Sequence, residues 1–303
     1  MEKNTLVKLG AEVEEALRKR GPVVALESTV IAQGLPRPLN LETAGRLEQI
    51  VRDAGATPAT IAVLNGELCA GLNEKQIEFI ANDNDIKKIS TRDLPLARTR
   101  RWNAATTVAS TIWIAQRAGI EVFATGGIGG VHRGSAHDVS ADLPELARTA
   151  IAVVCSGAKI VLDLAATREW LETYGITVVG YQCDEMPAFY SRRSRLPVDA
   201  QVDSPGDVVK IIRSQRDLGI KTALLVAVPV PEPDEVPSEM LERVILESLK
   251  EAEQNQIAGR DVTPFLLSRM SEASGGATLR ANVALLKNNA RVAAEIAVAA
   301  YGK

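Results

Sequence analysis

The sequence predicts an α/β fold whose central sheet is mostly parallel and is covered by helices on both faces. Short apolar runs rich in β-branched residues, such as PVVALESTVIA and TAIAVVC, alternate with segments of helical period along most of the 303 residues. These runs are continuously apolar, which is typical of parallel strands buried on both faces. Right-handed βαβ units follow from that alternation. No repeat or linker marks a boundary, so we expect one domain over residues 1–303.

The individual elements follow from local patterns. Helices are expected where apolar residues recur at helical spacing, and strands where β-branched runs end in turns. The expected helices cover about residues 5–20, 40–54, NEKQIEFIAN, 107–118, DLPELART, 162–174, 206–216, 237–255 and 278–300. The expected strands are PVVALESTVIA, TPATIAVLNGEL with a turn at Asn65-Gly66, KKIS, IEVFAT, TAIAVVC, ITVVGY and TALLVAV. The segment 188–205 is expected to be irregular because of its prolines and basic residues.

Composition limits the classes of function. The net charge is −3 and aromatic residues make up 4% of the chain, so nucleic-acid binding by a basic surface or by ring stacking is not expected. The charged N-terminal segment lacks an apolar signal region, and no apolar run is long enough for a membrane span. Cys69, Cys155 and Cys183 are widely separated and form no disulfide or metal pattern. We therefore expect a cytoplasmic protein with reduced cysteines.

The only two histidines lie in a glycine-rich loop, GGIGGVHRGSAHDVSAD, after the expected strand EVFAT. Glycines permit positive φ and a close approach to a ligand, and exposed N–H groups in such a loop can bind an anion. His132 replaces the third glycine of the dinucleotide-binding pattern, so that pattern is absent. Asp138 and Asp142, on either side of Ser140, could bind a hard divalent cation. Alternatively, Asp138 or Ser140 caps the next helix.

Two side chains could carry the chemistry. Lys159 ends the turn SGAK between apolar neighbours and before an expected helix; burial and the helix dipole would both favour its neutral, nucleophilic form. An ordinary surface lysine is the alternative. Glu27 is a carboxylate in an apolar strand, where burial would raise its pKa toward the range of a general acid. Asn282 and Asn289 share one face of the last helix and could bind a base edge or tie down a loop.

These motifs together resemble the pseudouridine-5′-phosphate glycosidase family, also called the indigoidine synthase A-like family. The resemblance covers nearly the whole chain. It rests on ALESTVIAQGLPRP, PATIAVLNGEL, KKISTRDLP, ATTVAST, FATGGIGGVHRG, DVSADLPEL, VVCSGAK, PAFYSRRS, VTPFLL and LRANVALLKNNAR. It implies a three-layer α/β/α fold with a mostly parallel, mixed sheet, and a homotrimer. It also implies reversible cleavage of pseudouridine 5′-phosphate to uracil and ribose 5-phosphate with a divalent metal such as Mn²⁺.

The resemblance also implies roles for single residues. Lys159 would form a Schiff base with C1 of the ring-opened sugar, because a C-glycoside has a carbon leaving group and needs an electron sink at C1. Glu27 would donate the proton to the aglycone, and His132 would assist ring opening or bind phosphate. Asp138 would bind the metal, and Asn282 would face the uracil. The expected contacts to the sugar phosphate are Lys88, Val108, Thr125, Ser140, Ala141 and Asp142.

Some positions depart from the family pattern and raise the question of the aglycone. They are Gln33, Ala105, a shortened segment after His132, Gln182, Cys183, Met186 and Val228. A pocket containing Cys183, Met186 and Val228 would be more apolar and would suit a polycyclic partner. We therefore expect C-ribosylation of an aromatic natural-product precursor, of the alnumycin type, in antibiotic biosynthesis. The alternative is a housekeeping pseudouridine-5′-phosphate glycosidase.

Two other classes of protein are less consistent with the sequence. A sugar-phosphate-binding protein without activity would be expected to lack Lys159 or Glu27, and both are present. A class I aldolase-like enzyme shares the Schiff-base lysine but has eight regular βα repeats, which the chain does not display.

Overall fold

The computed structural model describes residues 6–134, 137–257 and 262–301. The strands are β1 (Val7–Leu9), β2 (Val23–Glu27), β3 (Thr57–Leu64), β4 (Glu67–Ala70), β5 (Lys87–Ile89), β6 (Ala104–Thr106), β7 (Val122–Ala124), β8 (Val131–His132), β9 (Ala152–Cys155), β10 (Leu162–Asp163), β11 (Thr177–Tyr181), β12 (Ala200–Val202) and β13 (Leu224–Ala227). The helices are α1 (Ala11–Arg18), α2 (Leu39–Asp53), α3 (Glu74–Asn82), α4 (Leu94–Thr99), α5 (Val108–Ala118), α6 (Asp142–Leu146), α7 (Leu164–Thr173), α8 (Pro205–Asp217), α9 (Ser238–Gln254), α10 (Val262–Ala273) and α11 (Ala277–Tyr301). Short turns of helix are η1 (Val30–Gly34), η2 (Thr91–Asp93) and η3 (Glu232–Asp234).

The central sheet has 11 strands in the order β1-β4-β3-β2-β7-β9-β13-β11-β12, with β6 paired to β3 and β5 paired to β6. Neighbouring strands run parallel except where β3 meets β4 and β6. A separate antiparallel pair joins β8 to β10. The predicted α/β fold with a mostly parallel, mixed sheet is confirmed.

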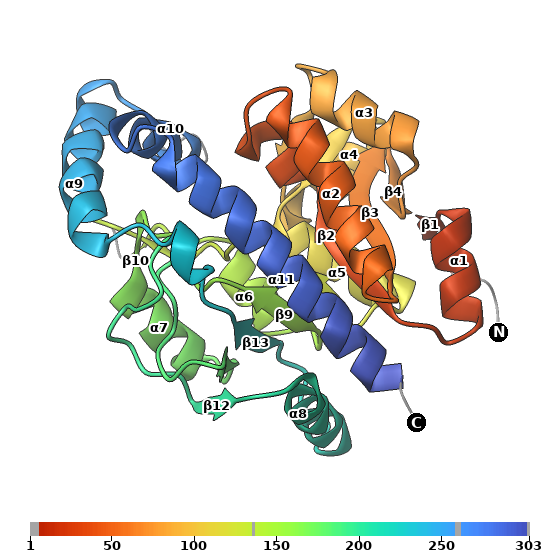
Figure 1. The fold of residues 1–303 in the computed structure, drawn as a ribbon. Helices are drawn as coiled ribbons and strands as arrows, with labels where there is room; N and C mark the ends of the chain where they lie inside the picture. The colour runs from red at the N-terminus through yellow and green to blue at the C-terminus, as the bar shows by residue number, and fades with distance from the viewer. Residues whose placement is uncertain (1–5, 135–136, 258–261, 302–303) are drawn as a thin grey trace.

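Helices cover both faces of this sheet. The long helix α11 crosses one face over β2, β7 and β9 and packs between α2 and α8 (Figure 1). On the other face α5 packs against β2, β3 and β4, with α6 beside it. The strands β2, β9 and β13 are buried along their whole length, which explains their continuous apolar sequences. Within the described ranges, none of the helices combines the length and the apolar character needed to cross a bilayer.

The start of the chain differs from the expected helix over 5–20. Val7–Leu9 pairs in parallel with β4, and the helix begins only at Ala11. Gly10 separates the two elements and donates its N–H to the carbonyl of Ala70 at 2.9 Å. A Cβ at Gly10 would lie 2.1 Å from the carbonyl oxygen of Gly71, so the strand-to-helix change needs a glycine.

Three further differences lie in the second half of the chain. Three helices close it, not two, because α10 lies between the two that were expected. The helix expected over 162–174 begins at Leu164, where Asp163 caps it by accepting a hydrogen bond from the N–H of Ala166 at 2.9 Å. Residues 162 and 163 form β10 instead. Within the segment expected to be irregular, Ala200–Val202 extends the edge of the sheet as β12.

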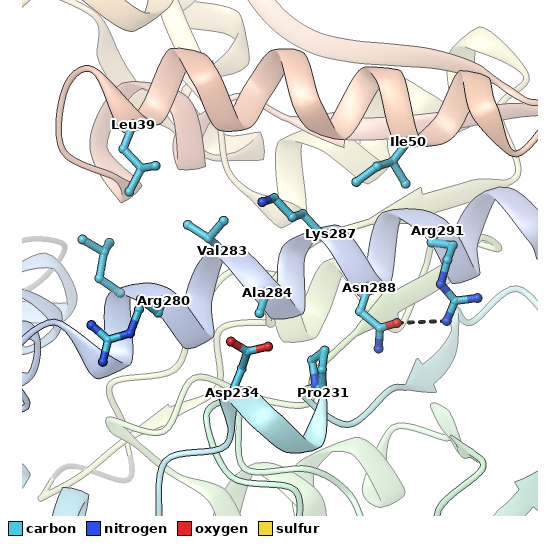
Figure 2. Close-up of a pocket in the computed structure, with 11 residues that line it drawn as sticks. Leu39, Ile50, Pro231, Asp234, Arg280, Val283, Ala284, Lys287, Asn288 and Arg291 are labelled. Atoms are coloured by element: carbon cyan, nitrogen blue, oxygen red, sulfur yellow. Dashed lines mark hydrogen bonds between the residues drawn. The ribbon is translucent and has the colours of Figure 1, made fainter.

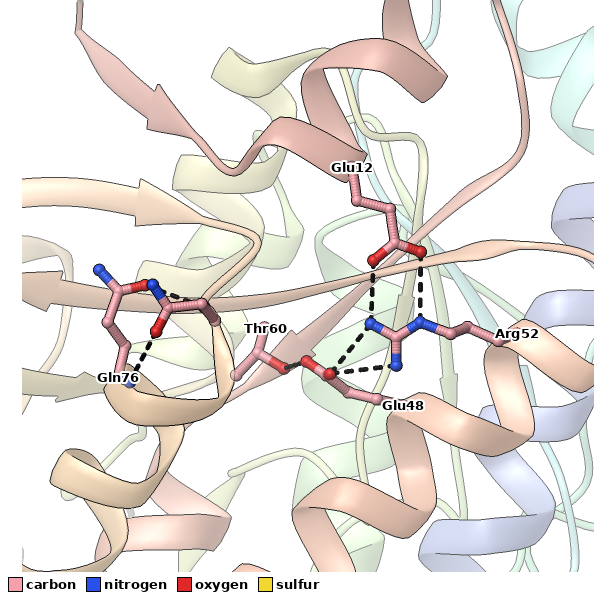
Figure 3. A network of polar contacts seen from close by, with 6 residues as sticks. Glu12, Glu48, Arg52, Thr60 and Gln76 are labelled. Carbon is pink, nitrogen blue, oxygen red and sulfur yellow. Dashed lines mark hydrogen bonds and ion pairs between the residues drawn. The ribbon is translucent and has the colours of Figure 1, made fainter.

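A polar network fixes α1 against α2 and β3 (Figure 3). Arg52 donates to Glu12 at 2.9 Å and to Glu48 at 3.3 Å, and the hydroxyl of Thr60 donates to Glu48 at 2.6 Å. Burial raises the pKa of Glu48, and the hydrogen bonds from Thr60 and Arg52 oppose that rise. These side-chain hydrogen bonds therefore stabilise the edge of the sheet that carries β1, in addition to the pairing of β1 with β4.

Candidate active site

The carboxyl ends of three adjacent parallel strands carry the predicted chemical groups. Glu27 is the last residue of β2, Thr125 follows β7, and the segment ending at Lys159 follows β9. In the register, Leu26 pairs with Ala124 and Ala124 pairs with Val154. Ligand crevices of open α/β sheets lie at such carboxyl ends.

Glu27 is 8% exposed, and its carboxylate accepts a hydrogen bond from the hydroxyl of Thr125. Burial raises the pKa of Glu27, as the sequence predicted. The positive charge of Lys159, the hydrogen bond from Thr125 and the charge of Lys88 oppose this rise. Glu27 therefore holds a proton more tightly than an exposed glutamate, and the amine of Lys159 lies within its electrostatic reach.

Backbone hydrogen bonds join the Lys159 segment to the glycine loop. Lys159 donates its N–H to Ile128 at 3.1 Å, Ile128 to Gly157 at 3.0 Å, and Ser156 to Gly126 at 2.9 Å. Lys159 is half-buried between two buried neighbours. The expectation that it precedes a helix directly is wrong, since β10 comes before α7. The first residue of α7, Leu164, comes five residues after Lys159.

The glycines of this loop serve close packing. Of the described glycines with positive φ, none lies between residues 126 and 130. A Cβ at Gly129 would lie 2.1 Å from the hydroxyl of Ser140, and one at Gly127 would lie 2.7 Å from the ring of Phe189. The N–H of Gly129 donates to Asp142 at 2.8 Å. The expected anion nest is therefore wrong for Gly129, whose N–H is already used.

Asp142 joins two walls of the site. It is 5% exposed, and its carboxylate accepts from the N–H of Ala109, at the start of α5, at 2.9 Å and from Gly129 at 2.8 Å. The hydroxyl of Ser140 accepts a hydrogen bond from the N–H of Asp142, the first residue of α6, at 3.3 Å. It does not bond to the second or third residue of α6, as the side chain of a helix cap would. The carboxylate of Asp142 thus fixes the glycine loop against the helix end.

A cavity of about 340 Å³ lies at this point, with Glu27 and Lys159 in its lining. It contains every predicted site residue except Thr125 and Asn282. Its other predicted lining residues are Lys88, Val108, His132, Asp138, Ser140, Ala141 and Asp142. Sequence reasoning missed Thr29, Ser90, Arg92 and Thr107, which also line it, although Ser90 and Arg92 lie within the quoted segment KKISTRDLP. The cavity is polar and carries several cationic side chains, so it suits a phosphorylated sugar.

The predicted metal ligand lies at the cavity edge. The Oδ2 of Asp138, whose side chain is 49% exposed, lies 3.4 Å from Nδ1 of His132, which is 20% exposed. In the described part of the chain, no group of three or more His, Cys, Asp or Glu side chains could hold a metal ion. The donor set therefore fits only a hard cation that keeps several waters or takes oxygens from a substrate.

The two asparagines of α11 have different surroundings. Asn289 is fully buried and donates to the carbonyl of Thr125 at 2.8 Å and to the hydroxyl of Ser156 at 3.1 Å. It therefore holds in place the loops that follow β7 and β9. Asn282 is 9% exposed and lines a second cavity, of about 380 Å³, together with Gln33 and Tyr190.

The positions expected to make the pocket apolar do not line the cavity. Met186 is fully buried, Val228 is 2% exposed, and neither lines the active-site cavity or the cavity of Asn282. The thiol of Cys183 points to the carbonyl of Ala227, at 3.6 Å. None of these three side chains therefore gives either cavity an apolar wall, contrary to what a polycyclic aglycone would require.

A larger groove of about 650 Å³ lies between α2, α11 and η3 (Figure 2). Leu39, Ile50 and Val283 contribute apolar surface, and Lys287 and Arg291 contribute charge. None of the predicted site residues lines it. Size alone therefore does not identify the active site in this fold.

Comparison with known proteins agrees with the motifs. A profile of the family described as "Indigoidine synthase A like protein" matches residues 12–299. Pseudouridine-5′-phosphate glycosidase of Caldanaerobacter subterraneus subsp. tengcongensis is 50% identical over 297 residues, 97% of each chain. The enzyme of that name from Kosmotoga olearia is 52% identical over 281 residues, 93% of this chain and 97% of its own.

Two solved structures are also similar. The prealnumycin C-glycosynthase AlnA, in complex with ribulose 5-phosphate, superposes with a TM-score of 0.90 at 40% identity over 97% of both chains. An indigoidine synthase A-like protein from Thermotoga maritima superposes with a TM-score of 0.90 at 38% identity, over 98% of this chain and 97% of its own.

Proposed function

The chain belongs to the indigoidine synthase A-like family and is an enzyme of the glycosidase type, and we propose that it cleaves pseudouridine 5′-phosphate reversibly to uracil and ribose 5-phosphate. The observation that carries this proposal is the meeting of Glu27 and Lys159 in one polar cavity. A C-glycoside needs both a nucleophile at C1 and a proton donor to the leaving carbon.

The housekeeping reaction has more support than C-ribosylation of a natural product. The relatives named pseudouridine-5′-phosphate glycosidase are 50% and 52% identical to this chain, and the prealnumycin C-glycosynthase is 40% identical. Met186 and Val228, on which the expectation of a polycyclic partner depended, line neither of the two cavities described at this end of the sheet. We therefore prefer uracil as the aglycone.

The amine of Lys159 attacks C1 of the sugar, and the bond from C1 to the ring oxygen breaks. The ring oxygen takes up a proton, for which the half-buried imidazole of His132 is the donor in this proposal. Lys88 and Arg92 line the same cavity, and in this proposal they bind the 5-phosphate. The product of this step is an open-chain sugar bonded to Lys159 through nitrogen.

The ammonium formed on Lys159 gives a proton back to His132, and the freed nitrogen lone pair then expels C5 of the uracil and forms an iminium at C1. Glu27 delivers the proton that C5 needs, and the carboxylate left behind is stabilised by Thr125 and by the nearby cations. Water hydrolyses the iminium and releases ribose 5-phosphate and the free amine of Lys159. One water is consumed in each cleavage, and the reverse sequence makes the C–C bond.

A divalent cation, with Mn²⁺ as the candidate, would be held by Asp138 and water. It would supply positive charge to substrate oxygens, and His132 would orient the Asp138 carboxylate. The homotrimer implied by the resemblance and the cytoplasmic location expected from the cysteines and the charged N-terminal segment remain predictions. Light scattering of the purified protein tests the first.

The decisive experiment combines turnover with trapping. The purified protein is incubated with pseudouridine 5′-phosphate, and uracil release is followed by chromatography. In parallel, the protein is incubated with ribose 5-phosphate, reduced with borohydride and digested for mass spectrometry. We expect uracil release and a reduced pentose phosphate adduct on Lys159. No adduct, or an adduct on another lysine, would refute the nucleophile. Turnover with a polycyclic quinone acceptor but not with uracil would restore the natural-product function.

A further inference from the structure

The amide of Asn289 joins the two loops that carry the proposed acid and nucleophile. Its Nδ2 donates to the carbonyl of Thr125 at 2.8 Å, and it lies 3.1 Å from the hydroxyl of Ser156. Its Oδ1 accepts from the same hydroxyl at 3.4 Å. Thr125 follows β7 and Ser156 follows β9, so one side chain of α11 bonds to the carboxyl ends of two adjacent strands.

Each of these partners leads to a group of the proposed reaction. The hydroxyl of Thr125 donates to the carboxylate of Glu27, while the carbonyl of the same residue accepts from Asn289. Ser156 begins the segment SGAK and donates its N–H to Gly126 at 2.9 Å, which keeps this segment beside the glycine loop. Asn289 has an exposed fraction of 0%, so it is out of reach of substrate.

We propose that Asn289 is a positioning residue that, acting through Thr125, orients the carboxyl of Glu27 and holds it in register with the loop of Lys159. This inference rests on the proposed roles of Glu27 and Lys159. Burying a primary amide is costly unless it is bonded, and the bonds of Asn289 go to these two loops. The position of the amide therefore fixes the position of the Thr125 backbone, and with it the direction of the Thr125 hydroxyl.

The test uses two substitutions that remove one link each while keeping side-chain volume: Thr125→Val removes the hydroxyl, and Asn289→Leu removes the amide. We expect each to lower kcat at least about tenfold, because a hydrogen bond to a charged group is lost or misdirected, while KM changes less than about threefold. The hydroxyl stabilises the charged carboxylate, so its loss raises the pKa of Glu27. Cleavage needs protonated Glu27, so the fall in kcat/KM at high pH moves to higher pH in both variants.

Two controls separate positioning from general packing. Asn288→Leu changes the neighbouring asparagine, which faces the groove of Figure 2 and donates to Pro229 at 3.3 Å. It should leave kcat and the pH profile unchanged. Thr125→Ser keeps the hydroxyl and should restore both. In the Thr125→Val/Asn289→Leu double variant, the fall in kcat/KM at high pH should move no further than in Thr125→Val alone. Both substitutions act on the same hydrogen bond, from Thr125 to Glu27.

A direct titration keeps the inference testable without turnover. The side-chain carboxyls are labelled with ¹³C, and the Glu27 resonance is assigned with Glu27→Gln. We expect this resonance to titrate at higher pH in Thr125→Val, and in Asn289→Leu if that variant folds, than in the wild type. An unchanged titration in Thr125→Val, or a folded Asn289→Leu that raises KM alone, would overturn the inference. A wild type that releases no uracil would refute the proposed function instead, and the titration would still decide the role of Asn289.

Discussion

Glu27 and Thr125 lie side by side at the carboxyl ends of β2 and β7, and the hydroxyl of Thr125 donates to the carboxylate of Glu27. The register of the two parallel strands places them there, because Leu26 pairs with Ala124 immediately before them. A buried acid is thus held by a neighbour that cannot itself change charge. This arrangement suits a group that must hold and deliver one proton.

We expect Glu27→Gln to lower the rate of uracil release about 100- to 10,000-fold, which is the usual range for loss of a general acid. The amide keeps the size of the side chain and can still accept from Thr125, so folding should survive. The rate is measured with saturating pseudouridine 5′-phosphate. Glu78→Gln, on the exposed side of α3, is the matched control and should retain full activity.

The same variant should change stability in a pH-dependent way. The pKa of Glu27 is raised in the folded protein above its ordinary value of 4.5, so the folded state binds the proton more tightly than the unfolded chain. The stability contribution of this group is therefore greatest at low pH and is lost as pH rises from about 4.5 through the folded-state pKa. Glu27→Gln should gain stability relative to the wild type over that window. Urea unfolding from pH 4 to 8 checks this, and a constant difference would contradict it.

Lys159→Arg keeps a positive charge but removes the nucleophile. We expect uracil release to fall at least about a thousandfold, as for other enzymes that lose a covalent nucleophile, and the borohydride adduct to disappear. Lys287→Arg provides a matched control, because Lys287 lines the separate groove of Figure 2. If Lys159→Arg still gave a trapped pentose phosphate, the amine of another residue would have to be the nucleophile.

Much of the fold could be predicted because its central parallel strands are continuously apolar runs. β2, β9 and β13 are buried along their length and stand out in the sequence. β1 and β6 have three residues each and were missed, although β5, of the same length, was expected from KKIS. They owe their strand conformation to pairing with β4, β3 and β5, which a local pattern does not contain.

Nine of the eleven predicted site residues line one cavity, but the surroundings of the two asparagines of α11 could not be predicted from their spacing. The spacing of Asn282 and Asn289 places them on one face of α11, but seven residues of helix span about 10.5 Å. They therefore meet different neighbours: one lines a second cavity, and the other bonds to Thr125 and Ser156. The depth of Met186 could not be predicted either, since its motif lies in a segment without regular structure.

The metal proposal predicts a specific dependence on Asp138. Dialysis against a chelator should abolish activity and Mn²⁺ should restore it. Titration calorimetry of the metal-free protein should show Mn²⁺ binding that weakens at least about tenfold in Asp138→Asn. The stability of this variant should stay within about 0.5 kcal/mol of the wild type, because the side chain is half exposed. Asp234→Asn, in the groove of Figure 2, should bind Mn²⁺ normally. Equal affinity in Asp138→Asn and the wild type would rule out this ligand.

Gly129→Ala tests whether the glycine loop is shaped by packing. The added Cβ would lie 2.1 Å from the hydroxyl of Ser140 and 2.8 Å from the carboxylate of Asp142, and both are held in place. The loop must shift, which should cost about 1–3 kcal/mol of stability and about 100-fold in activity. Gly45→Ala, in α2 with open space around it, should instead stabilise by about 0.5–1 kcal/mol. Unfolding midpoints and turnover distinguish the two. A Gly129→Ala enzyme with normal stability and rate would show that the contact among Gly129, Ser140 and Asp142 does not set the cavity wall.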